Sequence, residues 1–365
     1  MARAWLITVL SSLLCGVVAC GQGTTHPAPA EALPVAGGAD TIDVSPSADA
    51  GACVGVEVAA EALPVDLFAV VDRSGSMADA TSTGVSKWYA TKMAFHDFLE
   101  HAPSGMGFGL SLFPSPGSSS ASCATEYYRE QALPISDIQQ MASGALARLD
   151  KSKPQGQTPT APALVAALDL ASMYALDHVE RSVVVVLATD GLPTTCSPTD
   201  TAALGQLAKA ALESPAHVRT LVVASRSLDG TDLSGFDELA AAGGTGRALS
   251  IDPRADFAAQ LRSALESAAT HAVACDLALP EPPPGSRLDY DAINVVLDGS
   301  KGRATLPRVA GPAECGAAGG WYYDVDPRTA APARLNMCKS SCEHAGPVGT
   351  ATGLRVELGC KSLVR

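Results

Sequence analysis

Short apolar runs alternate with helical patterns through about the first three quarters of the chain. The apolar runs predict strands at residues 65–71, 108–113, 182–188, 218–224 and, as an edge strand, 247–251. Apolar residues at helical spacing predict helices at residues 87–101, 137–149, 161–176, 201–212, 236–242 and 255–269. Ser136 is the expected N-cap of the second helix. This alternation predicts an α/β fold with a Rossmann-like, doubly wound, mostly parallel sheet, in a domain that spans residues 53–271.

The pattern changes at residue 272. A proline-rich segment, Pro280–Pro284, interrupts regular structure, and Asp298–Gly302 has the composition of a hairpin turn. Short strand-like runs follow at residues 292–297, 304–309, 321–325 and 354–358. We therefore predict a second, smaller β-rich module over residues 272–365.

The first 19 residues have the pattern of a signal peptide. Arg3 precedes the uncharged run Ala4–Ala19, which is shorter than the roughly 20 residues of a membrane-spanning helix. The run ends directly before Cys20, an arrangement that resembles the bacterial lipobox and predicts lipidation of that cysteine. Ordinary signal cleavage nearby, leaving Cys20 free, is the alternative. Because Gly21 is not aspartate, nothing resembles an inner-membrane retention signal, and we expect an exported cell-envelope lipoprotein of the outer membrane.

Residues 20–52 form the next segment. They contain no aromatic residue, lysine or arginine and consist mostly of small and polar residues and proline. Such a composition buries too little apolar surface to offset the entropy of ordering. We predict a disordered tether between the lipid and the folded domain.

The charge balance narrows the class of partner. The formal net charge is −13, from 25 basic and 38 acidic residues. A chain of this charge offers no basic patch that would attract phosphates. The sequence therefore argues against a nucleic acid as partner and is compatible with cation binding. The lysines and arginines are scattered, which predicts that they lie on the solvated surface.

The cysteine count predicts disulfides. Besides Cys20, eight cysteines follow the signal peptide, and an even number in an exported chain predicts disulfides. They are Cys53, Cys123, Cys196, Cys275, Cys315, Cys338, Cys342 and Cys360. Eight cysteines allow 105 pairings. Five of them lie after residue 272, so one must pair outside that module or stay free; Cys53 is the candidate partner, which leaves Cys123 and Cys196 for each other.

Three polar segments stand beside the predicted strands and helices. Asp72, Ser74 and Ser76 follow the first strand, Thr158 precedes a helix, and Asp190 follows the apolar strand 182–188. Each segment alone is an ordinary turn or helix start. In a doubly wound sheet, however, loops at the carboxyl ends of the strands meet in one crevice. Carboxylate and hydroxyl oxygens are hard donors that suit Mg²⁺, Mn²⁺ or Ca²⁺.

Together these segments resemble the metal-ion-dependent adhesion site of von Willebrand factor type A domains. The resemblance covers about residues 62–271 and implies Mg²⁺, or else Mn²⁺ or Ca²⁺, as the bound ion. It implies direct contacts from Ser74, Ser76 and Thr158, with Asp72 and Asp190 acting directly or through water. One position of the ion would stay open for an aspartate or glutamate of a protein partner. The run Gly320–Asp324 is similar to a tail in exported proteins of this family from myxobacteria-like bacteria.

The expected function is therefore that of a lipid-anchored, non-enzymatic binding protein that captures an acidic protein ligand through a divalent ion. One alternative is a structural or accessory envelope protein in which the ion only stabilises the fold. An enzyme acting on envelope polymers is disfavoured, because no histidine or glutamate lies near the three segments and no hydrolase, zincin or phosphate-loop motif is present. Cys338, Cys342 and His344 could ligate zinc, but disulfides fit an exported chain better.

Overall fold

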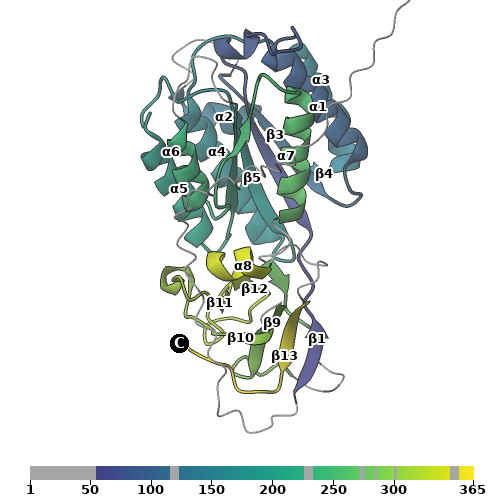
Figure 1. Cartoon of the computed structure of the whole chain (residues 1–365), viewed down its shortest axis with the longest axis vertical. Helices are drawn as coiled ribbons and strands as arrows, with labels where there is room; N and C mark the ends of the chain where they lie inside the picture. Colours follow the sequence, from purple (N-terminus) through teal and green to yellow (C-terminus); the bar gives the residue numbers. More distant parts are fainter. Residues whose placement is uncertain are drawn as a thin grey trace, which may run out of the picture. The chain divides into compact units, whose positions relative to one another are not determined.

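A six-stranded sheet organises the first part of the described chain (Figure 1). Its strands are β2 (Val65–Asp72), β3 (Gly107–Phe113), β4 (Leu133–Asp137), β5 (Ser182–Thr189), β6 (Arg219–Ser225) and β7 (Leu249–Ile251), in the order β4-β3-β2-β5-β6-β7. Every neighbouring pair is parallel except β3 and β4. The predicted α/β fold with a doubly wound, mostly parallel sheet is confirmed.

This computed structural model describes residues 55–115, 123–225, 233–271, 276–282, 285, 287–299, 302–345 and 353–365. The predicted signal peptide, the tether and the lipidation of Cys20 lie outside these residues, as do Cys53 and Cys275. Among the described residues, no helix combines the length and apolar character that crossing a membrane requires.

Helices cover both faces of the sheet. One face packs on α1 (Lys87–His101), α3 (Ile138–Lys151) and α7 (Phe257–His271). The other packs on α2 (Thr125–Gln131), α4 (Thr160–Asp177), α5 (Thr201–Glu213) and α6 (Ser234–Ala242). Strand β2 explains why both faces need a cover, because Leu67 and Val71 enter one core while Phe68 and Val70 enter the other.

The caps show where sequence and structure differ. Ser86 caps α1, since its side chain accepts a hydrogen bond from Tyr89 N. The N-cap of α3 is Asp137, not Ser136, and its carboxylate accepts from Gln139 N. Ser136 instead lies in β4, an antiparallel edge strand whose mixed pattern was not predicted as a strand. The extended chain thus continues one residue further before the helix begins.

The C-terminal part contains two small antiparallel sheets, as the predicted β-rich module requires. The first has the order β1-β13-β9-β10 and the second the order β11-β12-β8. Their strands are β1 (Val56–Ala59), β8 (Asp276–Ala278), β9 (Ile293–Gly299), β10 (Gly302–Leu306), β11 (Trp321–Tyr323), β12 (Arg334–Met337) and β13 (Gly353–Leu358). Strand β1 precedes the α/β sheet in sequence yet pairs with β13. The chain therefore enters the α/β part from a sheet that its own C-terminal strand helps to build.

Disulfides join segments in both parts. Cys123 pairs with Cys196, as predicted, and Cys315 pairs with Cys338 beside the short helix α8 (Lys339–Ala345). Cys342 and Cys360 are disulfide-bonded as well. With the cysteines oxidised in this way, zinc ligation by Cys338 and Cys342 is not the arrangement found.

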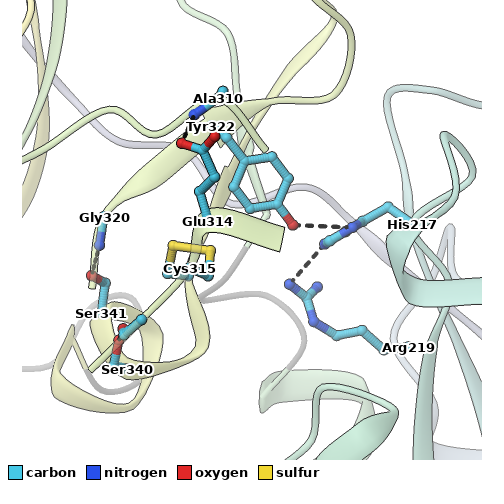
Figure 2. Close-up of a disulfide and its surroundings, with 11 residues drawn as sticks. His217, Arg219, Ala310, Glu314, Cys315, Gly320, Tyr322, Ser340 and Ser341 are labelled. Atoms are coloured by element: carbon cyan, nitrogen blue, oxygen red, sulfur yellow. Dashed lines mark hydrogen bonds between the residues drawn. A yellow bond between two sulfur atoms is a disulfide. The ribbon is translucent and has the colours of Figure 1, made fainter. Parts of the chain in front are cut away.

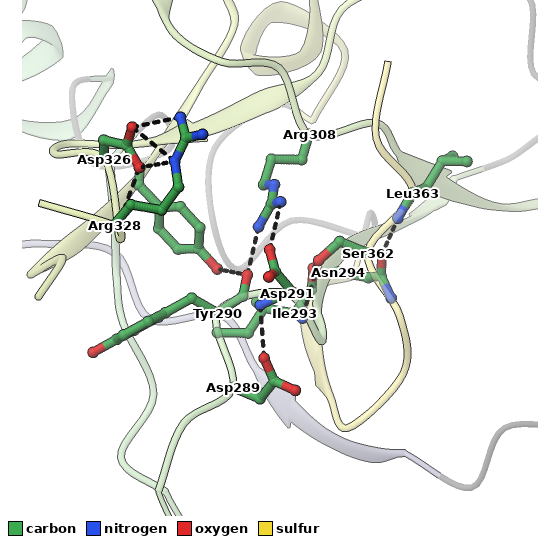
Figure 3. A network of polar contacts seen from close by, with 11 residues as sticks. Asp289, Tyr290, Asp291, Ile293, Asn294, Arg308, Asp326, Arg328, Ser362 and Leu363 are labelled. Carbon is green, nitrogen blue, oxygen red and sulfur yellow. Dashed lines mark hydrogen bonds and ion pairs between the residues drawn. The ribbon is translucent and has the colours of Figure 1, made fainter.

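A polar network fixes the last residues of the chain (Figure 3). Arg308 donates to the carbonyl of Tyr290 and, at 2.9 Å, to Asp291. Leu363 N donates to the side chain of Asn294 at 2.9 Å, and the Ser362 hydroxyl donates to Ile293 O at 2.7 Å. The C-terminal segment is thereby held against the start of β9.

Charged side chains of the α/β part and the C-terminal part meet in a buried cluster. Asp276 in β8 accepts from Arg219 Nη1 at 2.5 Å and from the Ser182 hydroxyl at 2.6 Å. Figure 2 shows Tyr322 with its hydroxyl toward His217, which in turn faces Arg219. Arg334 in β12 donates to the carbonyls of Pro215 and Ala216, both at 3.1 Å.

Candidate functional site

The strand order places the candidate site at the centre of the sheet. From β2 the chain adds β3 and β4 on one side and then crosses to β5 on the other side. Ligands of doubly wound sheets bind at such a switch, beyond the carboxyl ends of the two strands. Asp72 is the last residue of β2, and Asp190 directly follows β5. The structure thus brings together two carboxylates that are more than a hundred residues apart in sequence.

Asp72 is fully buried at this edge. One carboxylate oxygen accepts from Ser74 N at 2.7 Å, and the other accepts from the Thr189 hydroxyl at 2.6 Å. Burial and then the nearby charge of Asp190 raise the pKa of Asp72 from 3.8 to about 7. The surroundings of Asp72 therefore disfavour its ionised form, because too little positive charge lies nearby to compensate it.

Two serine hydroxyls connect the loop after β2 to Asp190. The short 3₁₀ helix η1 (Gly75–Ala78) turns the chain so that Ser76 donates to Asp190 Oδ1 at 2.8 Å. The hydroxyl oxygens of Ser74 and Ser76 lie 3.1 Å apart. Ser74 is buried, but Ser76 is exposed, so the site is open to solvent on its side.

Thr158 belongs to a neighbouring loop that backbone hydrogen bonds hold in place. Gly75 N donates to Gly156 O at 3.0 Å, and Thr158 exchanges hydrogen bonds with Thr194 through its own backbone. Thr158 is 5% exposed. The hydrogen-bonded set consists of Asp72, Ser74, Ser76 and Asp190, and Thr158 is brought to the same edge by its backbone.

Arg73 ties the loops of the site to one another. Its backbone N donates to Phe113 O at 2.6 Å, and its backbone O accepts from Gln155 N at 2.8 Å. Its guanidinium donates to Pro114 O at 2.7 Å and to Lys153 O at 2.6 Å. Arg73 is 2% exposed, which corrects the prediction that the basic residues lie on the solvated surface.

An Arg73→Met variant is expected to lose about 1–3 kcal/mol of unfolding free energy, because the buried carbonyl of Pro114 and the partly buried carbonyl of Lys153 lose their donor. Urea unfolding measures the loss. Arg247→Met, which removes an exposed guanidinium whose side chain is 85% accessible, is the matched control and should leave the midpoint unchanged. An Arg73 variant as stable as this control would show that the guanidinium does not hold the loops.

Lys87 is the residue of the site that the sequence did not reveal. It begins α1, is 4% exposed, and its ammonium lies 2.8 Å from Asp190 Oδ2. From the sequence pattern, Lys87 was only the first residue of a predicted amphipathic helix, with no indication that it is buried. A usable signal was present, however, since a positive charge in the first turn opposes the helix dipole and calls for a nearby anion.

The donor set fits a hard divalent ion. Among the described residues, no three His, Cys, Asp or Glu side chains are grouped to hold a metal. The predicted site does not need such a group, because it combines two carboxylates with hydroxyls. Oxygens on adjacent corners of an octahedral Mg²⁺ site are roughly 3 Å apart. The 3.1 Å between Ser74 and Ser76 and the 2.8 Å between Ser76 and Asp190 match that spacing.

Comparisons with known proteins find similar folds among solved structures. No family model and no curated protein matches the chain. A von Willebrand factor type A protein from Catenulispora acidiphila is 15% identical, with a TM-score of 0.41 over 85% of this chain and 63% of that protein. The pilus adhesin SpaC from Lactobacillus rhamnosus GG is 14% identical, with a TM-score of 0.42 over 81% of this chain and 39% of SpaC. The manganese-loaded TRAP protein of Plasmodium vivax is 16% identical, with a TM-score of 0.34 over 64% of this chain and 94% of TRAP. At these identities the likeness concerns the fold and not the function.

Proposed function

We propose that the chain is a metal-dependent binding protein with a von Willebrand factor type A-like domain. The divalent ion, Mg²⁺ or else Mn²⁺ or Ca²⁺, would be held by the oxygen donors Asp72, Ser74, Ser76, Thr158 and Asp190. Its role would be to capture an aspartate or glutamate side chain of a protein partner. The observation that carries the proposal is the pair of buried carboxylates at the switch point of the sheet, joined by serine hydroxyls.

The charges of the site support binding of an acidic group. Two carboxylates and several neutral hydroxyls only balance the charge of a divalent ion, so the ion keeps an attraction for a further carboxylate. The exposed side of the site, at Ser76, gives a partner access. Affinity would then depend on the ion, because without it the partner's carboxylate would meet Asp190.

The partners of the two serines support a non-enzymatic role. The Ser76 hydroxyl donates to the carboxylate of Asp190, and the Ser74 hydroxyl contacts Ser76. Nucleophilic catalysis by serine needs a base that accepts the hydroxyl proton, most often histidine. The location at the cell envelope, with a lipid on Cys20, completes the proposal and rests on the sequence alone.

Thermal unfolding of the purified protein in EDTA and in Mg²⁺, Mn²⁺ or Ca²⁺ tests the metal site. At an ion concentration 100 times Kd, binding stabilises the folded state by about 2.7 kcal/mol. For a domain of this size, that is a rise of Tm of about 5–10 °C. The rise should vanish in Asp190→Ala. No rise in the wild type at millimolar ion would end the proposal.

Peptide pairs that differ only in Asp or Glu against Asn or Gln separate adhesion from the structural alternative. Adhesion predicts binding of acidic peptides alone, in Mg²⁺ but not in EDTA. If the ion raises Tm while no acidic peptide in a large array binds, the ion serves the fold, and the alternative of a structural or accessory envelope protein is favoured.

A further inference from the structure

Lys87 occupies a position where it must interfere with an ion in the candidate site. Its ammonium and the carboxylate of Asp190 are both almost inaccessible, with 5% and 1% of their side chains exposed. One carboxylate oxygen of Asp190 accepts a hydrogen bond from the Ser76 hydroxyl, and the other accepts one from the Lys87 ammonium. A divalent ion held by Ser76 and Asp190 would lie close to this ammonium.

The repulsion between the two cations would be large in this setting. Charges a few ångströms apart near a protein surface interact strongly, and burial weakens the screening by salt. The ammonium also supplies part of the positive charge that the carboxylate pair needs. Lys87 and the ion thus compensate the same charge, and each lowers the affinity of the site for the other.

A second carboxylate lies within reach of the same ammonium. Asp79 Oδ2 is 3.7 Å from Lys87 Nζ, and its side chain is 67% exposed. Asp79 directly follows η1, and its backbone O accepts from Lys87 N at 2.9 Å, so the two residues are held together. A small rotation of the lysine side chain would exchange the buried partner for the exposed one.

We propose that Lys87 is an internal cation that competes with a divalent ion for Asp190, and that ion binding moves its ammonium toward Asp79. This inference rests on the proposed metal site and adds its regulation. Competition by Lys87 lowers the affinity of the site for the ion, so that its occupancy changes with the ion concentration. The residue acts through Asp190 and is a positioning residue, not a metal ligand.

Binding of Mn²⁺ alone, followed by the electron paramagnetic resonance of the free ion, tests the proposal. Lys87→Met keeps the length of the side chain and removes its charge, and it should bind Mn²⁺ at least tenfold more tightly than the wild type. Lys92→Met, on the same helix, is the matched control, because Lys92 Nζ lies 3.6 Å from Asp150, away from the site. It should bind as the wild type does.

The outcomes separate this inference from the proposed function. Wild-type binding with no gain in Lys87→Met overturns the inference and leaves the metal site intact. Binding by Lys87→Met alone supports the inference and shows that the wild-type site is not metal-dependent. Binding by neither protein overturns both. Should Lys87→Met fail to fold in EDTA, Lys87→Gln, whose amide can still donate to Asp190, gives the same comparison.

Asp79→Asn tests the second position of the ammonium. It should weaken Mn²⁺ binding in the wild type, since the displaced ammonium loses its acceptor, and should have no effect in the Lys87→Met background. A double-mutant cycle isolates this coupling. An equal loss in both backgrounds would mean that Asp79 acts through its own charge and would overturn the movement toward it.

Discussion

Replacing Asp72 with asparagine is expected to stabilise the protein in EDTA at pH 8 while it abolishes stabilisation by metal. The pKa of Asp72 is raised from 3.8 to about 7, first by burial and then by Asp190. The folded state therefore holds the proton more tightly than the unfolded chain does. Stability from this group is full below pH 3.8 and is lost as the pH rises to 7, where the buried charge costs up to about 4 kcal/mol.

Asparagine can enter the same hydrogen bonds. Its oxygen can accept from Ser74 N, as Asp72 Oδ1 does. Its amide can donate to the Thr189 hydroxyl, which is also 3.0 Å from Gly191 O and can donate there instead. No buried group loses its hydrogen-bond partner in Asp72→Asn. Most of the cost of the buried charge should therefore be recovered, and we expect the free energy of unfolding to rise by about 2 kcal/mol at pH 8.

Thermal unfolding of both proteins in EDTA from pH 5 to pH 8 measures the effect. The difference between the variant and the wild type should grow with pH and level off above pH 7. Asp326→Asn, at an exposed ion pair with Arg328, is the control and should show no such growth. A variant less stable than the wild type at pH 8 would mean that Lys87 and the hydrogen bonds already compensate the charge of Asp72.

Such a gain would show why the two carboxylates are better explained by binding than by folding. A buried pair of like charges weakens the fold, and it persists only where another role needs it. A divalent ion that binds between Asp72 and Asp190 relieves the repulsion between the two carboxylates. This relief adds to the free energy of ion binding.

The fold was predictable where one physical signal dominated. The run Val183–Leu187 is apolar at every position, and it forms the central strand β5. Helices α1 and α5 were predicted from their apolar spacing within a residue of their observed bounds, and in the structure Ser86 and Asp200 cap them. The strands β1, β8 and β12 were missed, since each has only three or four residues and is defined by its pairing rather than by its own pattern.

Some residues of the candidate site were predictable from the sequence and others were not. Asp72 and Asp190 follow predicted strands, so topology alone brings them together. The buried cations Lys87 and Arg73 were not predicted, because a charged residue is normally exposed and its burial depends on partners distant in sequence. Lys87 lies more than a hundred residues from Asp190, and its one local signal, a positive charge in the first turn of α1, does not indicate which anion it meets.

The largest loss of stability is expected for Asp276→Ala, at the junction of the α/β part and the C-terminal part. Burial alone would raise the pKa of Asp276, but Arg219 and His217 hold it well below its usual range. Removal of the carboxylate leaves Arg219 buried with an uncompensated charge and leaves the Ser182 hydroxyl without its acceptor. Breaking a buried ion pair in this way costs about 3–5 kcal/mol.

Urea unfolding at pH 7 measures this loss, and its cooperativity shows what Asp276 does. One transition, shifted to lower urea, means that the C-terminal part and the α/β sheet still unfold together and that Asp276 contributes stability only. Two separate transitions mean that the buried cluster couples the two parts. Arg308→Met, within the C-terminal part, is the matched control. It breaks a partly buried hydrogen bond to Tyr290 O but leaves the junction intact, so it should lower stability without separating the transitions. An Asp276→Ala protein as stable as the wild type would show that Arg219 finds another acceptor and that the junction is held by packing around Arg334 and Tyr322 instead.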